Sequence, residues 1–227
     1  KLDFLYAGAL PGKRRRDMPR EKAYREGLTV IRKALGDAYF LTCGAPILPS
    51  LGLCDGMRVG PDVANYWDSE RDNRLLTNFT TPGVRNAIRT SLNRLWLSPV
   101  VHTDPDVLYF RSNNASLTPE QKRLLQDLGR ICGFKATSDL PEWLSDEERN
   151  TLHQLLESQD EVKRTGRYTF RINGREVDFS PAMDVPHPAG AANPAWHIVR
   201  WGADQPWVLN LVNNLEKAKV QKALEKP

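Results

Sequence analysis

The sequence predicts an α/β fold with a helix-covered parallel sheet, followed by a separate antiparallel β unit. Up to about residue 160, strand-like apolar runs alternate with amphipathic helical patterns, which is typical of parallel α/β sheets. After residue 160 the pattern changes to short strands around Asn173-Gly174, a dipeptide that favours tight hairpin turns. We therefore expect one domain over residues 1–160 and an antiparallel β domain over residues 161–227.

Four helices are predicted by apolar residues at helical spacing and by residues typical of helix ends. Gly36 follows the first helix in the position where a left-handed residue commonly ends a helix. Thr81-Pro82 begins the second, and the capping boxes Thr118–Gln121 and Ser145–Glu148 begin the third and fourth. The helices are expected over residues 20–35, 82–96, 118–133 and 145–157.

Short apolar runs that end at Gly, Pro or Asp predict the strands. The first is expected to be the end of a buried strand that runs into a loop. Strands are expected within residues 2–9, 38–43, 55–60, 99–103 and 134–137, then at 168–172, 177–179, 196–201 and 207–212. Polar residues of the first domain fall where these strands end, which is where α/β sheets build active sites.

Composition excludes several classes of function. No run approaches the ~18 apolar residues of a membrane-spanning helix, so no membrane partner is expected. The net charge is +4 and its excess lies in one segment, Lys13–Arg16, so we expect a solvated loop and no nucleic-acid partner. Three cysteines without a CxxC pair and four histidines without HxxH spacing support neither a disulfide framework nor a metal site. The chain begins at Lys1 without an initiator Met or a signal-peptide pattern; we expect a cytoplasmic protein, with secretion left open.

Asp3 is a carboxylate within an apolar run. Burial of an unpaired carboxylate would cost several kcal/mol, so Asp3 must be paired or functional. Lys1 lies on the same face of the strand because side chains alternate with period two. A structural ion pair and a functional site are both open interpretations of these two residues.

Arg58 and Asp62 flank Gly60-Pro61 at the end of the third strand. The simpler interpretation is that the two charges neutralise each other. The alternative is that Asp62 works with Asp3, because two carboxylates on separate strand ends are the minimal equipment for acid and nucleophilic catalysis at a glycosidic bond. His102, Asp104 and Asp106 suggest a metal site at first sight, but we expect a turn with hydrogen-bonded Asp side chains.

Four motifs give a more specific interpretation. In chain order they are Lys1-Leu2-Asp3-Phe4-Leu5-Tyr6-Ala7, Cys43-Gly44-Ala45-Pro46, Asp55-Gly56-Met57-Arg58-Val59-Gly60-Pro61-Asp62-Val63 and Asp104-Pro105-Asp106-Val107-Leu108. Together they closely resemble the retaining α-galactosidases of glycoside hydrolase family 36 and the wider melibiase clan. The resemblance covers most of residues 1–157.

The resemblance implies strands four to eight of a (β/α)8 TIM barrel, followed by an antiparallel β-sandwich-like domain. In the family's pattern Asp3 matches the catalytic nucleophile and Asp62 the acid/base. Lys1 and Arg58 match residues that bind hydroxyls of the sugar, and Cys43 with Gly44 matches a loop that lines the ring near O2. The Asp104-Pro105-Asp106 turn is expected to support the site rather than take part in the chemistry.

The implied function is that of a retaining glycoside hydrolase, which removes terminal α-D-galactosyl residues from oligosaccharides or glycoconjugates through a covalent glycosyl-enzyme intermediate. No cofactor or metal is implied. The alternatives are an α-N-acetylgalactosaminidase or related clan member, and a non-catalytic carbohydrate-binding barrel fragment. Because such a barrel takes ~250 residues, we expect its N-terminal part to be missing here and the 227-residue chain alone to be inactive. The sequence leaves open whether the protein forms a homo-oligomer.

Overall fold

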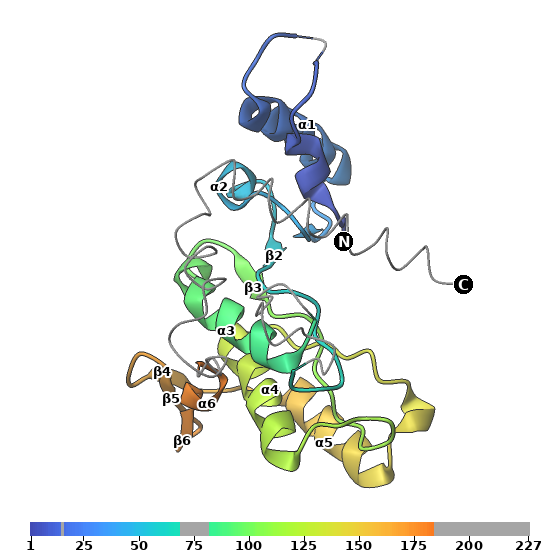
Figure 1. Ribbon diagram of the computed structural model, residues 1–227, viewed down its shortest axis with the longest axis vertical. Helices are drawn as coiled ribbons and strands as arrows, with labels where there is room; N and C mark the ends of the chain where they lie inside the picture. The colour runs from blue at the N-terminus through green and yellow to red at the C-terminus, as the bar shows by residue number, and fades with distance from the viewer. Residues whose placement is uncertain (15, 69–81, 184–227) are drawn as a thin grey trace, which may run out of the picture. The chain divides into compact units, whose positions relative to one another are not determined.

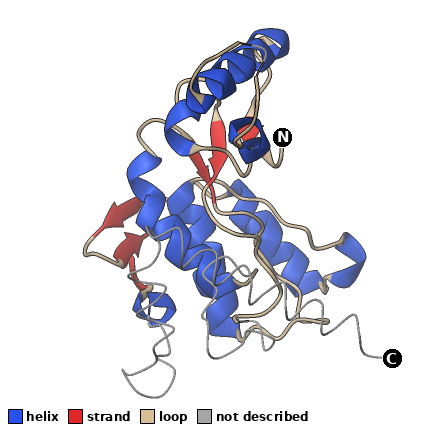
Figure 2. Cartoon of the chain, turned by 45° about the horizontal axis from the view of Figure 1, so that its top comes forward, coloured by secondary structure: helices blue, strands red, loops and turns tan. Residues whose placement is uncertain are grey.

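The computed structural model describes residues 1–14, 16–68 and 82–183, which all belong to one compact unit. Helices account for most of the regular structure in this part and the strands are short (Figure 2). The α-helices are α1 (Arg20–Leu35), α2 (Ile47–Ser50), α3 (Val84–Arg94), α4 (Pro119–Cys132), α5 (Asp146–Glu157) and α6 (Ser180–Met183). The 3-10 helices are η1 (Leu5–Ala9), η2 (Leu95–Leu97) and η3 (Pro141–Trp143). The strands are β1 (Leu41–Thr42), β2 (Gly56–Arg58), β3 (His102–Asp104), β4 (Val162–Arg164), β5 (Thr169–Ile172) and β6 (Arg175–Asp178). The strands expected at 196–201 and 207–212 lie outside the described residues.

The expected parallel sheet is present in the first part of the chain. Strands β1, β2 and β3 pair side by side in chain order and all run parallel. Figure 1 labels β2 and β3 of this sheet. Leu2 extends this order by an isolated parallel bridge to Thr42, in which Leu2 N donates to Leu41 O and Cys43 N donates to Leu2 O. The order across the sheet is therefore Leu2, β1, β2 and β3.

Three strand predictions are corrected. Residues 2–9 are not a strand beyond Leu2, because Phe4 turns into the left-handed region at φ 53° and η1 follows directly. The strand expected at 99–103 is β3, shifted toward Asp104, because Val100 N and Val101 N bond back to Leu97 O and keep these residues in turns. Residues 134–137 form no regular strand, although Ala136 O accepts a hydrogen bond of 2.7 Å from Leu108 N.

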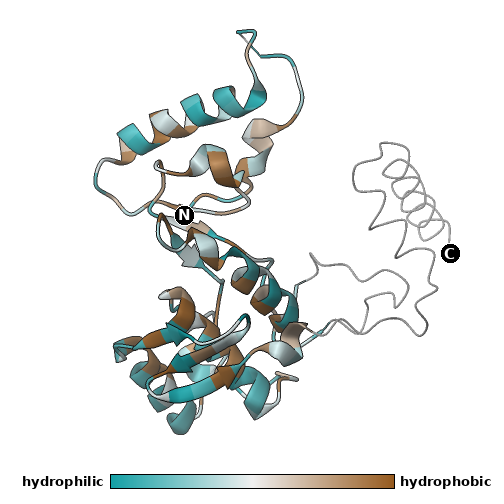
Figure 3. Ribbon diagram, turned by 90° about the vertical axis from the view of Figure 1, so that its left-hand side faces the viewer, coloured by the Kyte–Doolittle hydropathy of each residue, from teal (hydrophilic) through white to brown (hydrophobic). Residues whose placement is uncertain are grey.

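The end of α1 and the starts of α4 and α5 follow the local signals. Helix α1 has the expected bounds and is followed by Gly36 at φ 58°, and hydrophilic and hydrophobic residues alternate along it (Figure 3). Both expected capping boxes form at the starts of α4 and α5. Helix α3 begins at Val84, two residues later than expected. Within the ranges given above, no helix has the length and apolar character needed to cross a bilayer.

The Asn173-Gly174 hairpin forms as expected, with φ angles of 49° and 81°, and β4 adds a third antiparallel strand beside β5. This second sheet contacts α4, since Arg175 at the start of β6 donates to both carboxylate oxygens of Asp127 at 2.7 and 2.8 Å. Its inward side chains join one hydrophobic core with α3, α4 and α5. A smaller core of Met57, Val59, Leu97 and Val101 packs around β2 and holds the site-bearing strands in place.

Candidate active site

Three of the predicted site residues, Asp3, Cys43 and Arg58, lie at one edge of the parallel sheet. Leu2, Thr42, Met57 and Thr103 occupy one row across the sheet in the printed register. The next residue on each segment is therefore Asp3, Cys43, Arg58 and Asp104. We refer to these four residues as the strand-end row. Parallel strands place their carboxyl ends at the same edge, so residues far apart in the sequence become neighbours there.

Asp3 and Cys43 are in contact within the strand-end row. The Cys43 thiol hydrogen-bonds to the Asp3 carboxylate, and Phe4 N donates to Asp3 Oδ1 at 2.7 Å. These two hydrogen bonds lower the pKa of Asp3, with smaller contributions from the positive charges of Lys1 and Arg58. Burial and the Asp3 contact raise the pKa of the Cys43 thiol to about 11. Asp3 is therefore kept ionised and Cys43 neutral near neutral pH.

Lys1 has only a small effect on the pKa of Asp3. It is exposed, and its charge lowers the pKa of Asp3 less than the thiol and the Phe4 amide do. Asp3 is itself exposed in this chain, so the expectation of a carboxylate inside a buried strand was wrong. The cause is the turn at Phe4, which ends strand pairing directly after Leu2.

Gly44 directly follows Cys43 of the strand-end row and packs closely against the segment after Asp3. Its φ is 58°, and a Cβ at this position would lie 3.3 Å from the ring of Tyr6 and 3.5 Å from Cα of Phe4. Tyr6 N donates to Gly44 O at 2.7 Å, which ties the segment after Asp3 to the segment after Cys43. A side chain is disfavoured at Gly44 both by its backbone conformation and by this close approach.

Arg58 is the centre of a buried charge cluster. Three nitrogens of its guanidinium each face a carboxylate: Nε lies 3.1 Å from Asp104, Nη1 3.3 Å from Asp62 and Nη2 2.5 Å from Asp106. The side chains of Arg58 and Asp104 are 7% and 2% exposed, whereas that of Asp62 is 77% exposed. Arg58 therefore does pair with Asp62, as the simpler interpretation expected. Its two other partners, Asp104 and Asp106, are buried carboxylates on the interior side of the guanidinium.

Asp104 and Asp106 lie in the turn that was expected to support the site, and both contact Arg58. The expected turn with hydrogen-bonded Asp side chains is confirmed, since Asp106 N donates to Asp104 Oδ1 at 2.7 Å. Their ion pairs with Arg58 were not foreseen. The sequence held a signal for them, because Asp104 directly follows the strand expected at 99–103 and Arg58 lies near the end of the strand expected at 55–60. In the part of the chain that is described, no cluster of His, Cys, Asp and Glu is arranged to hold a metal ion.

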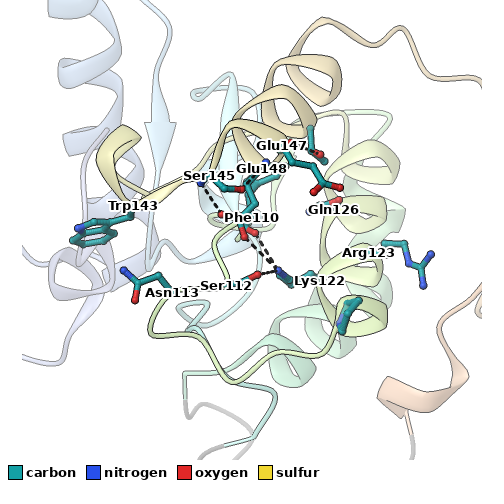
Figure 4. A pocket seen from close by; sticks show the side chains of 12 residues that line it. Phe110, Ser112, Asn113, Lys122, Arg123, Gln126, Trp143, Ser145, Glu147 and Glu148 are labelled. Atoms are coloured by element: carbon teal, nitrogen blue, oxygen red, sulfur yellow. Dashed lines mark hydrogen bonds and ion pairs between the residues drawn. The ribbon is translucent and has the colours of Figure 1, made fainter.

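A separate open pocket of about 730 Å³ lies between the first turns of α4 and α5 and contains none of the predicted site residues (Figure 4). Lys122 Nζ donates to Phe110 O at 3.2 Å and to Ser112 Oγ at 2.8 Å. Glu148 accepts from Ser145 N as part of the capping box and lies 4.0 Å from Lys122. The polar side chains that meet in this pocket therefore contact one another and link α4 to α5.

Solved structures of one bacterial enzyme resemble this chain. The α-galactosidase TtGalA from Thermus thermophilus, solved with p-nitrophenyl α-D-galactopyranoside, is 51% identical with a TM-score of 0.73, over 80% of this chain and 37% of that chain. The same enzyme solved with stachyose is 52% identical with a TM-score of 0.64, over 70% of this chain and 34% of that chain. The chain is a relative of the α-galactosidases of glycoside hydrolase family 36. No family model matches the chain.

This α-galactosidase relationship confirms the resemblance that the four motifs indicated. The matched part of this chain spans little more than a third of the length of TtGalA. Its parallel sheet and covering helices are the part of the expected α/β fold that the structure shows.

Proposed function

We propose that the whole protein is a retaining α-galactosidase that removes terminal α-D-galactosyl residues from oligosaccharides or glycoconjugates. The observation that carries the proposal is the strand-end row, in which an ionised Asp3 lies at the same sheet edge as Arg58 and its partner Asp62. The 51% identity to an α-galactosidase supports the choice of galactose. Stachyose and p-nitrophenyl α-galactoside, which TtGalA was solved with, are the substrates we propose to test.

In the proposed reaction Asp3 is the nucleophile. Its carboxylate attacks the anomeric carbon, the bond from that carbon to the leaving oxygen breaks, and a covalent galactosyl ester forms. A low pKa suits this role because the attacking carboxylate must be ionised. The hydrogen bonds from Cys43 and Phe4 support it by favouring the charged form of Asp3.

Asp62 is the proposed acid/base. It donates a proton to the leaving oxygen in the first step and takes one from water in the second, so that the ester is hydrolysed with net retention. Its exposure fits a group that must meet substrate and water. In a retaining enzyme the carboxyl groups of Asp3 and Asp62 are expected to stand ~5 Å apart in the substrate-bound state.

Lys1, Arg58, Cys43 and Gly44 are the proposed sugar-binding residues. A guanidinium has five N–H donors, so Arg58 can pair with its carboxylates and still donate to a galactose hydroxyl. Gly44 lets the loop approach closely because it has no side chain. We further propose that Leu2, β1, β2 and β3 are strands four to seven of a (β/α)8 barrel and that residues 134–137 are the eighth. Residues 161–227 would then begin the β domain.

The experiment is turnover of p-nitrophenyl α-galactoside by the whole protein and by Asp3→Asn and Asp62→Ala variants. Asp3→Asn should abolish turnover, whereas Asp62→Ala should leave the first step on this activated substrate partly intact, since nitrophenolate leaves without a proton. Cys132→Ala, which alters a buried cysteine outside the row, is the control. The same assay on the 227-residue chain checks the expectation that it is inactive alone.

Full activity in Asp3→Asn would defeat the assignment of the nucleophile. Absence of turnover by the whole protein, with galactose still bound in calorimetry, would instead indicate a carbohydrate-binding module.

A further inference from the structure

The carboxylate of Asp106 joins two parts of the candidate site. Its Oδ1 lies 2.5 Å from Nη2 of Arg58, and its Oδ2 accepts a hydrogen bond of 2.7 Å from the backbone N–H of Val63. Val63 directly follows Asp62 in the sequence. One side chain therefore contacts both the arginine that pairs with Asp62 and the backbone that carries Asp62.

Asp106 is itself held firmly. Its side chain is 10% exposed, so water competes little for its two contacts. Its φ of 81° lies in a region that residues with a Cβ seldom adopt, and the hydrogen bond from its N–H to Asp104 Oδ1 supports that conformation. Asp104 in turn binds Nε of Arg58, which closes a ring of contacts among the three residues.

Asp62, in contrast, has a mostly exposed side chain that lies 3.3 Å from Arg58. The position of its carboxyl group therefore depends on the backbone of its loop and on the guanidinium beside it. Asp106 contacts both. General acid catalysis requires the acid to lie within hydrogen-bond reach of the leaving oxygen, so small displacements of this loop should affect proton transfer.

We propose that Asp106 is a positioning residue, which holds Arg58 and the Asp62 loop in the geometry that proton donation requires. The inference rests on the proposed function, in which Asp62 is the acid/base. It predicts that loss of the Asp106 carboxylate impairs protonation of the leaving group more than it impairs attack by Asp3.

The test compares two α-galactosides in the whole protein. 2,4-Dinitrophenyl α-galactoside has a leaving group that departs as a stable anion, whereas methyl α-galactoside must be protonated as it departs. In Asp106→Asn, kcat/KM should fall at least tenfold more for the methyl substrate than for the dinitrophenyl substrate, since general acid catalysis contributes ~10²–10⁴-fold. A smaller fraction of folded enzyme would lower both values equally and leave their ratio unchanged.

Asp139→Asn is the matched control. Asp139 is another buried carboxylate that accepts a backbone N–H, from Phe110 at 2.7 Å, and pairs with an arginine, Arg111 at 3.2 Å. Its substitution should lower stability and keep the ratio of the two kcat/KM values at the wild-type level. If Asp106→Asn does not accumulate, Asp106→Glu keeps the charge, displaces the carboxylate by one methylene and should shift the ratio in the same direction.

The outcomes separate the two proposals. A wild-type ratio in both Asp106 variants, together with a strongly shifted ratio in Asp62→Asn, overturns the positioning role and leaves the proposed function standing. An equal shift in Asp139→Asn also overturns it, because the effect would then follow from any buried carboxylate. A wild-type protein that hydrolyses neither substrate, or an Asp62→Asn variant with an unchanged ratio, overturns the assignment of the acid/base and this inference with it.

Discussion

Replacement of Arg58 by Met should destabilise the protein strongly at neutral pH. The substitution keeps a side chain of similar length and removes the positive charge that faces Asp104 and Asp106. Loss of one partner of a buried ion pair typically costs about 3–5 kcal/mol, because the remaining charge is left without compensation. Both carboxylates are at least nine-tenths buried, so we expect an effect within that range, whereas the contact with the exposed Asp62 adds less than about 1 kcal/mol.

The pH dependence of this loss has a definite sign. Burial already raises the pKa of Asp106. Without the guanidinium, which lowers the pKa of Asp106, that pKa should rise further in the folded state. A carboxyl whose pKa is raised by folding contributes stability at low pH and loses that contribution as pH rises through the raised pKa. The deficit of Arg58→Met should therefore be largest at pH 7 and shrink as pH falls toward about 4.

Urea unfolding followed by circular dichroism at pH 7 and at acid pH measures the effect. Arg58→Lys keeps the charge and should lose less stability, although an ammonium cannot reproduce the planar fork. Arg123→Met removes an exposed arginine that pairs with Glu120 one helical turn away, and should leave the free energy of unfolding close to the wild-type value. A wild-type free energy of unfolding for Arg58→Met at pH 7, or a deficit that does not change with pH, would refute the reasoning.

Two further predictions follow from features of the site and the core. Cys43→Ala removes the largest influence that lowers the pKa of Asp3, so the acidic limb of the kcat/KM profile should move to higher pH, while Cys132→Ala should leave it in place; an unmoved limb would argue against the thiol contact. Leu125→Ala should cost about 2–5 kcal/mol in urea unfolding because Leu125 is fully buried in the core shared by the helices and the second sheet; a loss below about 1 kcal/mol would mean that this core repacks readily.

The helices could be predicted from the sequence because their signals are local. The capping boxes at Thr118 and Ser145 and the glycine after Leu35 lie within a few residues of the ends they determine. Strand bounds depended on distant partners. Nothing near Phe4 predicts that the chain turns after Leu2, and β4 was missed because it is defined by pairing with β5 rather than by its own exposed residues.

The candidate site was predictable as a set of strand ends, although its internal contacts were not. The motifs indicated Lys1, Asp3, Cys43, Gly44, Arg58 and Asp62, and the register places three of these six, Asp3, Cys43 and Arg58, in the strand-end row. The carboxylates that hold Arg58 lie 46 and 48 positions further along the chain. Spacing within the Arg58–Asp62 motif favoured a local pair, whereas the buried partners of Arg58 come from the end of β3 and the turn that follows it.

The strand-end row has a consequence for folding and for the variation the chain can tolerate. The position of each residue in the row depends on the pairing of short parallel segments. Because these segments are far apart in the sequence, their contacts form slowly. The four side chains of the row should therefore come together in one step of folding, when the segments pair, rather than one after another. Extra residues in the loops between strands should leave the row intact. A single residue inserted within β1 would turn the side chain at the position of Cys43 to the opposite face of the sheet and separate it from Asp3.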